Sequence, residues 1–256
     1  IQSVQFQEDS EVRIIGKNSF SNSMITNITI PQHVTKICEN AFAGCELLNQ
    51  INFQENSELI IIGENSFNRC AIEKINIPSK VSEICPMAFS FCNQLENVEF
   101  SENSELKVIG NKAFCNTKIE NINIPASVVE LKDGWNTSMC NLKSIKIAEN
   151  RNLPMKISDD ENFIFGKIDS NSEGYDLLFF SNKDLDEVTI PPFIKKIASN
   201  AFAYSKVSTI KIPKQVTEIC QYAFSFCVNL QQVIFEDNSD LKIIGEYAFK
   251  NSSIET

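Results

Sequence analysis

The chain has 256 residues, of which 43% are hydrophobic, so it can bury a sizeable core. Its formal net charge of −10 argues against partners such as nucleic acid and anionic membrane surfaces, because both need a basic protein face. No apolar run approaches the roughly 18 residues of a membrane span, and the small numbers of Gly and Pro (8 each) exclude a linker or low-complexity chain.

Short segments in which apolar and polar residues alternate recur along the whole chain, and each predicts a β-strand with one buried face. In chain order they are residues 3–6, 27–30, 50–53, 74–77, 97–100, 121–124, 144–147, 187–190, 209–212 and 232–235. Successive segments follow one another at a nearly constant step in the low twenties, except between the seventh and the eighth. Every second strand is followed by a proline, and the alternate strands by an acidic loop of the "ENSEL" type.

A phenylalanine column accompanies the strands. It consists of Phe20, Phe42, Phe67, Phe89, Phe114, Phe202, Phe224 and Phe249. Wherever the repeat is regular, a shorter step such as Phe20 to Phe42 alternates with a longer one such as Phe42 to Phe67, so two coils make one double unit. One such unit cannot bury its apolar side alone, whereas stacked units make a continuous core. A step in the low twenties with one short strand per coil is typical of leucine-rich repeats.

The full pattern, "IPxxVxxIxxxAFxxCxxLxxVxF", resembles the leucine-rich repeat of the BspA-like surface proteins, also called the Treponema pallidum type, found in bacteria and in protists such as Trichomonas. The likeness covers about 1–147 and 185–256. It implies an α/β, mostly β, solenoid. We expect a right-handed superhelix of about ten coils, each of about 22–25 residues, with a parallel concave sheet and short helical or irregular convex turns.

Two places depart from the repeat. In the sixth coil Asn136 takes the position of the phenylalanine, and Trp135, one place earlier, is expected to fill the hole. Residues 148–184 contain two apolar runs around a turn-rich stretch, which we interpret as an irregular insert or a β-hairpin. We therefore predict a single domain over 1–256, with repeats in 1–147 and 185–256. Because the chain begins without Met and both ends fall inside a repeat, it is interpreted as a fragment of a longer chain with uncapped ends that could self-associate.

The sequence offers little catalytic or metal-binding chemistry. Seven of the nine cysteines stand in two columns of the repeat where other coils have residues such as Ser, Thr, Gly or Ala, so we expect reduced core thiols and not disulfides. His33 is the only histidine and no CxxC occurs, so zinc ligation and Ser–His or Cys–His catalysis lack their usual parts. We predict no enzyme activity, no catalytic residue, no metal and no cofactor. Of the three N-x-S/T sequons, at Asn27, Asn136 and Asn251, the one at Asn136 is expected on an outer turn and is the better glycan acceptor.

The remaining candidate site is the outward face of the strands, which is rich in amides and is expected to lack exposed aromatic anchors. The predicted ligand-binding residues on this concave face are Lys74, Asn76, Asn97, Glu99, Asn121, Asn123, Ser144 and Lys146. The resemblance implies a non-catalytic binding module of a cell-surface adhesin that recognises host or neighbouring-cell protein or glycan. Such a module would be extracellular, not itself membrane-inserted, with its anchor outside this segment. The alternative is an intracellular scaffold or self-associating structural solenoid.

Overall fold

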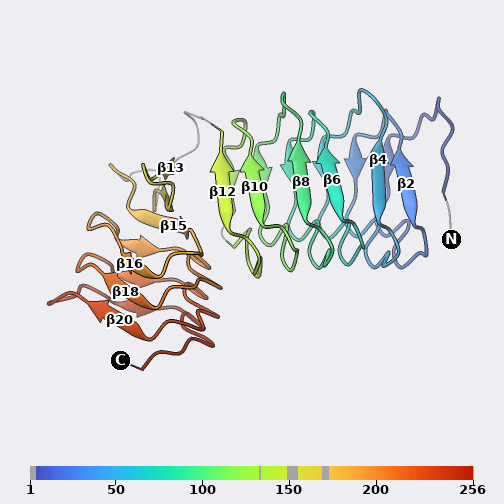
Figure 1. Ribbon diagram of the computed structural model, residues 1–256. Coiled ribbons are helices and arrows are strands. Elements are labelled where there is room, and N and C mark those ends of the chain that lie inside the picture. The colour runs from blue at the N-terminus through green and yellow to red at the C-terminus, as the bar shows by residue number, and fades with distance from the viewer. Residues whose placement is uncertain (1–3, 133, 149–154, 169–172, 256) are drawn as a thin grey trace. The chain divides into compact units, whose positions relative to one another are not determined.

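The computed structural model describes residues 4–132, 134–148, 155–168 and 173–255, and it shows a chain built of stacked β-coils (Figure 1). The coils form two compact units, Ile1–Leu153 (unit 1) and Pro154–Thr256 (unit 2), which we describe separately. Within the described ranges the chain contains strands and turns but no helix. Of the two forms predicted for the turns, helical or irregular, the helical one is therefore wrong, whereas the repeated coils and parallel strands are confirmed. The right-handed sense and the concave curvature stay predictions.

The turn around each phenylalanine explains why no helix forms there. The residues two places before and two places after the phenylalanine both have positive φ, for example Asn65 (52°) and Arg69 (60°) around Phe67. A left-handed residue at every fourth position interrupts the continuous right-handed backbone that an α-helix requires. The backbone bonds instead run to the next coil, as from the Phe42 amide to the Ser66 carbonyl (2.7 Å).

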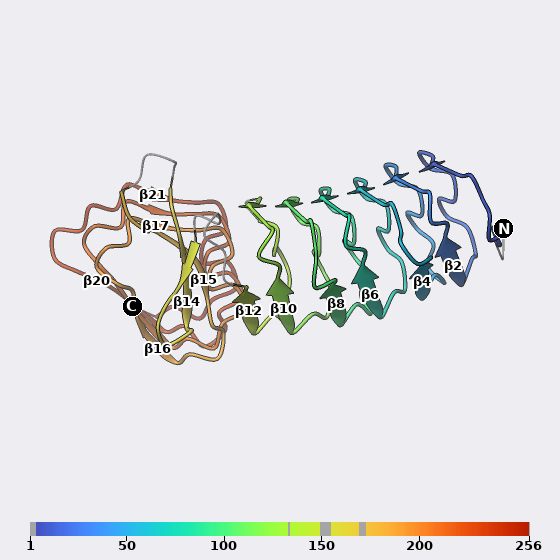
Figure 2. The ribbon, with the colours of Figure 1, turned by 90° about the horizontal axis from the view of Figure 1, so that it is seen from above.

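Unit 1 has two parallel strands in each regular coil, not the single strand that we expected. Figure 2 shows the long strands of this unit in one row. The long strands are β2 (Asn27–Ile30), β4 (Gln50–Phe53), β6 (Lys74–Ile77), β8 (Asn97–Phe100), β10 (Asn121–Ile124) and β12 (Ser144–Ile147). The short strands are β1 (Ile14–Ile15), β3 (Lys36–Ile37), β5 (Ile61–Ile62), β7 (Glu83–Ile84), β9 (Val108–Ile109) and β11 (Glu130–Leu131). The strand expected over 3–6 is not found in its described part, residues 4–6.

The two rows of strands in unit 1 differ in their pairing. The short strands form one continuous six-stranded parallel sheet in chain order. The long strands pair only in twos, as β2–β4, β6–β8 and β10–β12, and all three pairs share one register, in which Asn27 lies beside Gln50 and Lys74 beside Asn97. The starts of β4 and β6 are one residue further apart in the sequence than the starts of β2 and β4, and the same holds for β8 and β10. In each of these more widely separated pairs the two strands lie in different sheets. Every second gap between long strands is therefore open.

The core of unit 1 is the stacked phenylalanine column. The rings of Phe20, Phe42, Phe67, Phe89 and Phe114 lie nearly parallel, with successive centroids 5.1 to 5.6 Å apart. From Phe42 to Phe114 the side chains are completely buried, as predicted. In the sixth coil Trp135 is also completely buried, one residue before the position that phenylalanine has in the other coils.

Unit 2 begins with the segment that breaks the repeat. Its strands β13 (Met155–Ile157), β14 (Phe163–Gly166) and β15 (Leu177–Ser181) pair antiparallel in succession. Strand β15 then pairs parallel with β17 (Lys196–Ile197), which continues through β19 (Glu218–Ile219) and β21 (Ile243–Ile244). Within unit 2 the antiparallel segment thus extends the short-strand sheet at its first coil. The long strands β16 (Glu187–Thr189), β18 (Thr209–Ile212) and β20 (Gln232–Phe235) form a continuous ladder. The assignment of 1–256 to a single domain stays a prediction.

Glycine recurs where one coil approaches the backbone of the coil before it. A Cβ added to Gly110 would lie 2.5 Å from the Pro86 nitrogen and 2.6 Å from the Cys85 carbonyl carbon. Gly63 and Gly245 meet the preceding coil in the same way, whereas Gly16 has nothing within 4 Å. Close backbone contact between coils therefore requires glycine at three of these positions and not at the first.

We predict that Phe89→Ala lowers the free energy of unfolding by about 3–5 kcal/mol, because it leaves a cavity in the middle of the ring stack. The matched control is Phe91→Asn, two residues later on the same turn. Phe91 is 37% exposed and has a φ of 60°, a backbone conformation that asparagine tolerates better. We expect the control to change the stability by less than about 1 kcal/mol. Urea unfolding followed by circular dichroism measures both, and similar values for the two variants would show that the column is not the core.

We also predict that Gly110→Ala destabilises the chain by about 1–3 kcal/mol, because the new methyl group overlaps the backbone of the preceding coil. Gly16→Ala introduces the same methyl group into open space and should leave the stability unchanged or slightly higher. Thermal unfolding of the two variants tests the comparison. Equal losses of stability would contradict the close approach of the coils.

Candidate binding face

The outward side chains of the long strands form a row of polar groups along unit 1, which we call the long-strand face. In each strand the second residue points into the core, as Ile75 and Val98 do, and the first and third residues point outward. The predicted binding residues occupy these first and third positions on β6, β8, β10 and β12, and all are exposed except Ser144, which is half-buried.

The strand register brings the predicted residues together in two groups. On β6 and β8, Lys74 lies beside Asn97 and Asn76 beside Glu99. On β10 and β12, Asn121 lies beside Ser144 and Asn123 beside Lys146. Two hydrogen bonds connect these side chains: the Asn97 amide donates to Glu99 Oε1 (3.0 Å), and the Ser144 hydroxyl donates to Asn121 Oδ1 (2.6 Å).

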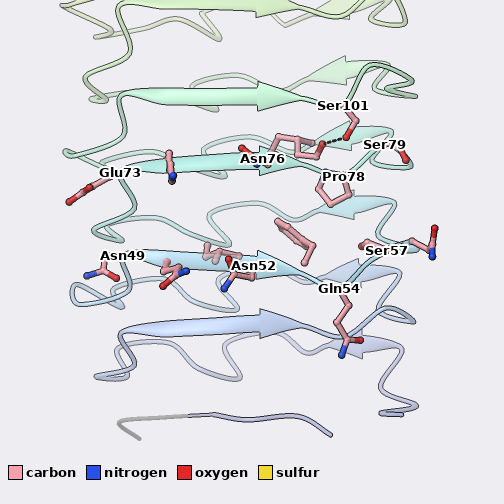
Figure 3. Close-up of a pocket in the computed structure, with 15 residues that line it drawn as sticks. Asn49, Asn52, Gln54, Ser57, Glu73, Asn76, Pro78, Ser79 and Ser101 are labelled. Atoms are coloured by element: carbon pink, nitrogen blue, oxygen red, sulfur yellow. Dashed lines mark hydrogen bonds between the residues drawn. The ribbon is translucent and has the colours of Figure 1, made fainter. Parts of the chain in front are cut away.

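The open gaps between the strand pairs contain two pockets. The first, of about 720 Å³, lies between β4 and β6 and is shown in Figure 3, with Asn52 and Asn76 on its two strands and Pro78 at one end. The second, of about 900 Å³, lies between β8 and β10 and has Glu99 and Asn123 at the corresponding positions. Because β8 lies one double unit after β4, the two pockets are repeats of one another.

The long loop after β4 explains why β4 pairs with the strand before it, β2, and not with the strand after it, β6. Residues 54–60 separate β4 from β5, whereas only 31–35 separate β2 from β3. The longer loop folds over the preceding coil, where the Gln54 amide donates to the Ile30 carbonyl (3.1 Å) and the Glu58 amide to the Gln32 carbonyl (2.8 Å). After β8 the same loop reaches back from Glu105 to Ser79 (2.7 Å). Each coil with a long loop is thus hydrogen-bonded to the coil before it, and the open gap lies between it and the next coil.

Each pocket also has a phenylalanine in its wall, which sequence reasoning missed. Phe53 and Phe100 are the last residues of β4 and β8, and both are half-buried and line the pockets. In the proline-bearing coils the same position is a buried isoleucine, such as Ile77. The replacement of Ile by Phe in alternate strands was the signal that could have identified this position. The long-strand face therefore does not lack accessible aromatic groups.

Ser127 adds an unsatisfied polar atom to the second pocket. Among the described residues that line this pocket, its Oγ is buried and has no hydrogen-bond partner. A hydroxyl in this state can donate to a ligand atom or accept from one.

The sequon at Asn136 does not lie on an exposed outer turn as expected. Its side chain is only 6% exposed, next to the buried Trp135, so the folded coil does not present it for glycosylation. Asn27 and Asn251 are the sequon asparagines with exposed side chains. The reason is that Asn136 takes the inward position that phenylalanine occupies in the other coils.

Five of the nine cysteines are buried in the core, and Cys140 is exposed. All nine are free, and four of them donate from Sγ to the carbonyl of the phenylalanine one coil earlier, as Cys92 does to Phe67 (3.1 Å). Thr117 makes the related bond to the carbonyl of Phe114 (2.9 Å), which explains why hydroxyl residues share this column. Burial raises the pKa of the Cys92 and Cys227 thiols to about 12, so these groups stay protonated and unreactive.

The described residues contain no group of three or more His, Cys, Asp and Glu side chains that could hold a metal ion. His33 Nδ1 lies 3.3 Å from Glu58 Oε2, in a loop contact between neighbouring coils. In the part of the chain that the structure describes, no helix is long and apolar enough to cross a membrane. What the face offers chemically is hydrogen bonding by amides, hydroxyls and a few charged groups.

Comparison with known proteins agrees with this architecture. A family model described as a BspA type leucine rich repeat region matches residues 13–143 and 167–256, in six copies. The crystal structure of the pneumococcal vaccine antigen PcpA is similar, with a TM-score of 0.79 and 22% sequence identity over 95% of this chain and 66% of that one. A leucine-rich repeat protein from Bacteroides ovatus ATCC 8483 has a TM-score of 0.64 and 26% identity over 98% of this chain. The chain spans 66% and 64% of the lengths of these two proteins, and no curated protein matches it.

The burial of the thiols generates a prediction for chemical modification. When the native chain is treated with iodoacetamide at neutral pH without reductant, Cys140 should react first, because it is the exposed cysteine. Cys45, Cys70, Cys92 and Cys227 are buried and should react only after unfolding in urea, where all nine thiols become alkylated. Mass spectrometry counts the modified groups. Two or more disulfides in the unreduced chain would contradict the assignment of these columns to the core.

Proposed function

Because the chain belongs to the BspA-type leucine-rich repeat family, we propose that it is a non-catalytic binding module of a cell-surface adhesin. The module recognises protein or glycan on a host or neighbouring cell through the long-strand face. The observation that carries this proposal is the face itself: a row of exposed polar side chains that the core does not use, interrupted by two pockets. The likeness to a vaccine antigen supports a position at the cell surface.

The chemistry of the face favours weak contacts that act together. Tight protein interfaces are enriched in Trp, Tyr and Arg, whereas the first and third positions of the unit 1 strands carry mainly Asn, Gln, Ser and Thr, with a few Lys and Glu. Single amide contacts supply modest free energy, because each replaces a hydrogen bond to water. Many copies on one cell would raise the overall strength of attachment by multivalency.

The alternative is an intracellular scaffold or a self-associating structural solenoid. A chain of this kind would not attach to other cells, so an attachment assay separates the two candidates.

We predict that the combined variant Asn97→Ala, Glu99→Ala, Asn121→Ala and Asn123→Ala weakens attachment of chain-coated beads to cultured epithelial cells by about tenfold or more. All four side chains are exposed, so the thermal stability should stay unchanged. Flow-cell counting of bound beads measures the effect.

The control variant is Glu55→Ala, Asn103→Ala and Glu105→Ala on the acidic loops beside the face, outside the strands themselves. Asn56 is avoided because its φ of 55° would strain an alanine. Attachment that survives the face variant and disappears in the loop variant would place binding on the loop edge and overturn the proposal.

A further inference from the structure

The open gaps in the long-strand face expose peptide groups that the folded chain does not pair. In a parallel ladder, alternate residues direct both their N–H and their C=O to the same neighbouring strand. The Gln50 and Gln54 amides bond back to the coil of β2, so on β4 the groups of Ile51 and Phe53 face the other way, toward β6. No ladder joins β4 to β6 among the described residues, and these groups therefore face an open gap.

The other side of the gap has the same property. The Glu73 and Ile77 carbonyls accept bonds from the coil of β8, so the peptide groups of Lys74 and Asn76 face β4. Pro78, at the end of the gap, has no N–H to offer. The gap between β8 and β10 repeats this arrangement with Val98 and Phe100 on one side and Asn121 and Asn123 on the other. Unpaired groups of this kind bind water or a ligand.

The width of the gap excludes one class of ligand. Cα atoms of β4 and β6, and of β8 and β10, come within 8 Å of each other. A peptide strand inserted between two others would need them about 9.6 Å apart, twice the spacing of about 4.8 Å between paired strands. The gap thus admits small polar groups that lie over it, such as hydroxyls, and not a further β-strand.

We propose that the two gaps are subsites for one neutral oligosaccharide that lies across the strands, along the stacking direction of unit 1. This inference rests on the proposed function and names the ligand class for the same face. A sugar hydroxyl both donates and accepts a hydrogen bond, and it therefore suits a gap that exposes N–H and C=O groups together. Asn52, Asn76 and Asn123, in the pocket walls, have amides that likewise donate and accept.

Two further features of the pockets fit a sugar ring. Phe53 and Phe100, one in each pocket, offer an accessible aromatic surface to the apolar C–H face of a pyranose. The charged residues in the first pocket wall are Glu73 and Lys74, which balance. The charged residues in the second pocket wall are Glu99, Glu102 and Lys146, which leaves one negative charge in excess. A wall that is neutral or slightly acidic, on a chain of net charge −10, disfavours sulfated and other anionic glycans.

Because the pocket occurs twice, it favours a ligand that is built of repeating units. Corresponding residues of the two pockets lie one double unit apart in the sequence, as Phe53 and Phe100 do. Two coils advance the stack by about 10 Å, twice the strand spacing, which is close to the length of two linked pyranose rings. A linear chain of repeating sugars can therefore place equivalent rings in both pockets.

The experiment measures binding of defined sugars to the chain by isothermal titration calorimetry. The probes are neutral linear hexasaccharides of glucose, mannose and N-acetylglucosamine, the matching disaccharides, and a heparin hexasaccharide as the anionic comparison. We expect at least one neutral hexasaccharide to bind, and to bind about tenfold or more tighter than its disaccharide, because a disaccharide is too short to place rings in both pockets. Heparin should not bind.

The variants test the two subsites separately. Asn52→Ala with Asn76→Ala in the first pocket, or Glu99→Ala with Asn123→Ala in the second, should reduce hexasaccharide affinity to that of the disaccharide and abolish the advantage of length. The matched control is Thr189→Ala with Lys211→Ala, at equally exposed positions on the β16–β18 ladder, which has no gap. It should bind like the unaltered chain.

Absence of binding by every neutral hexasaccharide at millimolar concentration would overturn the proposal. Loss of binding in the control variant, without any loss in the two pocket variants, would also overturn it. If no sugar binds but bead attachment to cells still depends on the face residues, the ligand class is wrong and the proposed function stands. If a hexasaccharide binds as described but beads do not attach to cells, the subsites are correct and the adhesin function is wrong.

Discussion

The contact between consecutive phenylalanine turns is the interaction on which the structure of each unit depends. At the regular turns that the structure describes inside each unit, the backbone of one coil donates to the next, as Phe89 does to Ala113 (2.8 Å), while the rings stack in the core. These bonds require the peptide planes of the turn to point along the stacking direction and not along the chain. The left-handed residues on both sides of the ring supply that orientation, and asparagine, which tolerates positive φ better than other side chains, is the commonest residue among them.

The pairing of the long strands is related to the spacing of the phenylalanine rings. In unit 1 successive rings lie 5.1 to 5.6 Å apart, more than the spacing of about 4.8 Å that a hydrogen-bonded ladder adopts. In unit 2 the corresponding distances are 4.8 and 5.0 Å, and there the long strands form an unbroken ladder. Wider ring spacing and an interrupted ladder therefore occur together. The alternation of long and short loops determines which of the gaps opens, because each long loop is bonded to the coil before it.

Much of the fold could be predicted from the sequence, because the same pattern of apolar residues recurs in many coils. The period, the position of the long strands and the burial of Phe42, Phe89 and Phe224 follow from apolar spacing alone. Spacing left the turns open between a helical and an irregular form, because it does not reveal the sign of φ, although the asparagines at positions such as Asn18, Asn40 and Asn65 were a visible sign of it. Two-residue strands such as β5 are too short to show a period of two.

The candidate site was predictable in its residues but not in its form. Alternation along each strand identifies which side chains point outward, whereas the pairing of strands depends on hydrogen bonds between coils far apart in the sequence. The step from β4 to β6 is one position longer than the step from β2 to β4, and this was visible, but its meaning depends on how the loop after each strand folds. Alternation alone directs Phe53 and Phe100, the fourth residues of their strands, toward the core. An open gap beside each of them exposes part of the ring.

The separation of the two sides of the coil has a consequence for function. Backbone bonds, rings and thiols at the phenylalanine turn, with the continuous ladder of short strands beside it, hold unit 1 together without the long-strand ladder being complete. Peptide groups in the gaps can then remain unpaired, because the free energy that they would add is not needed for the stack. In most proteins a buried sheet cannot leave such groups open, since each costs free energy when it lacks a partner. Here the gaps lie at the surface, where water can pair with these groups, and side chains on that face can vary without disturbing the column that specifies the fold.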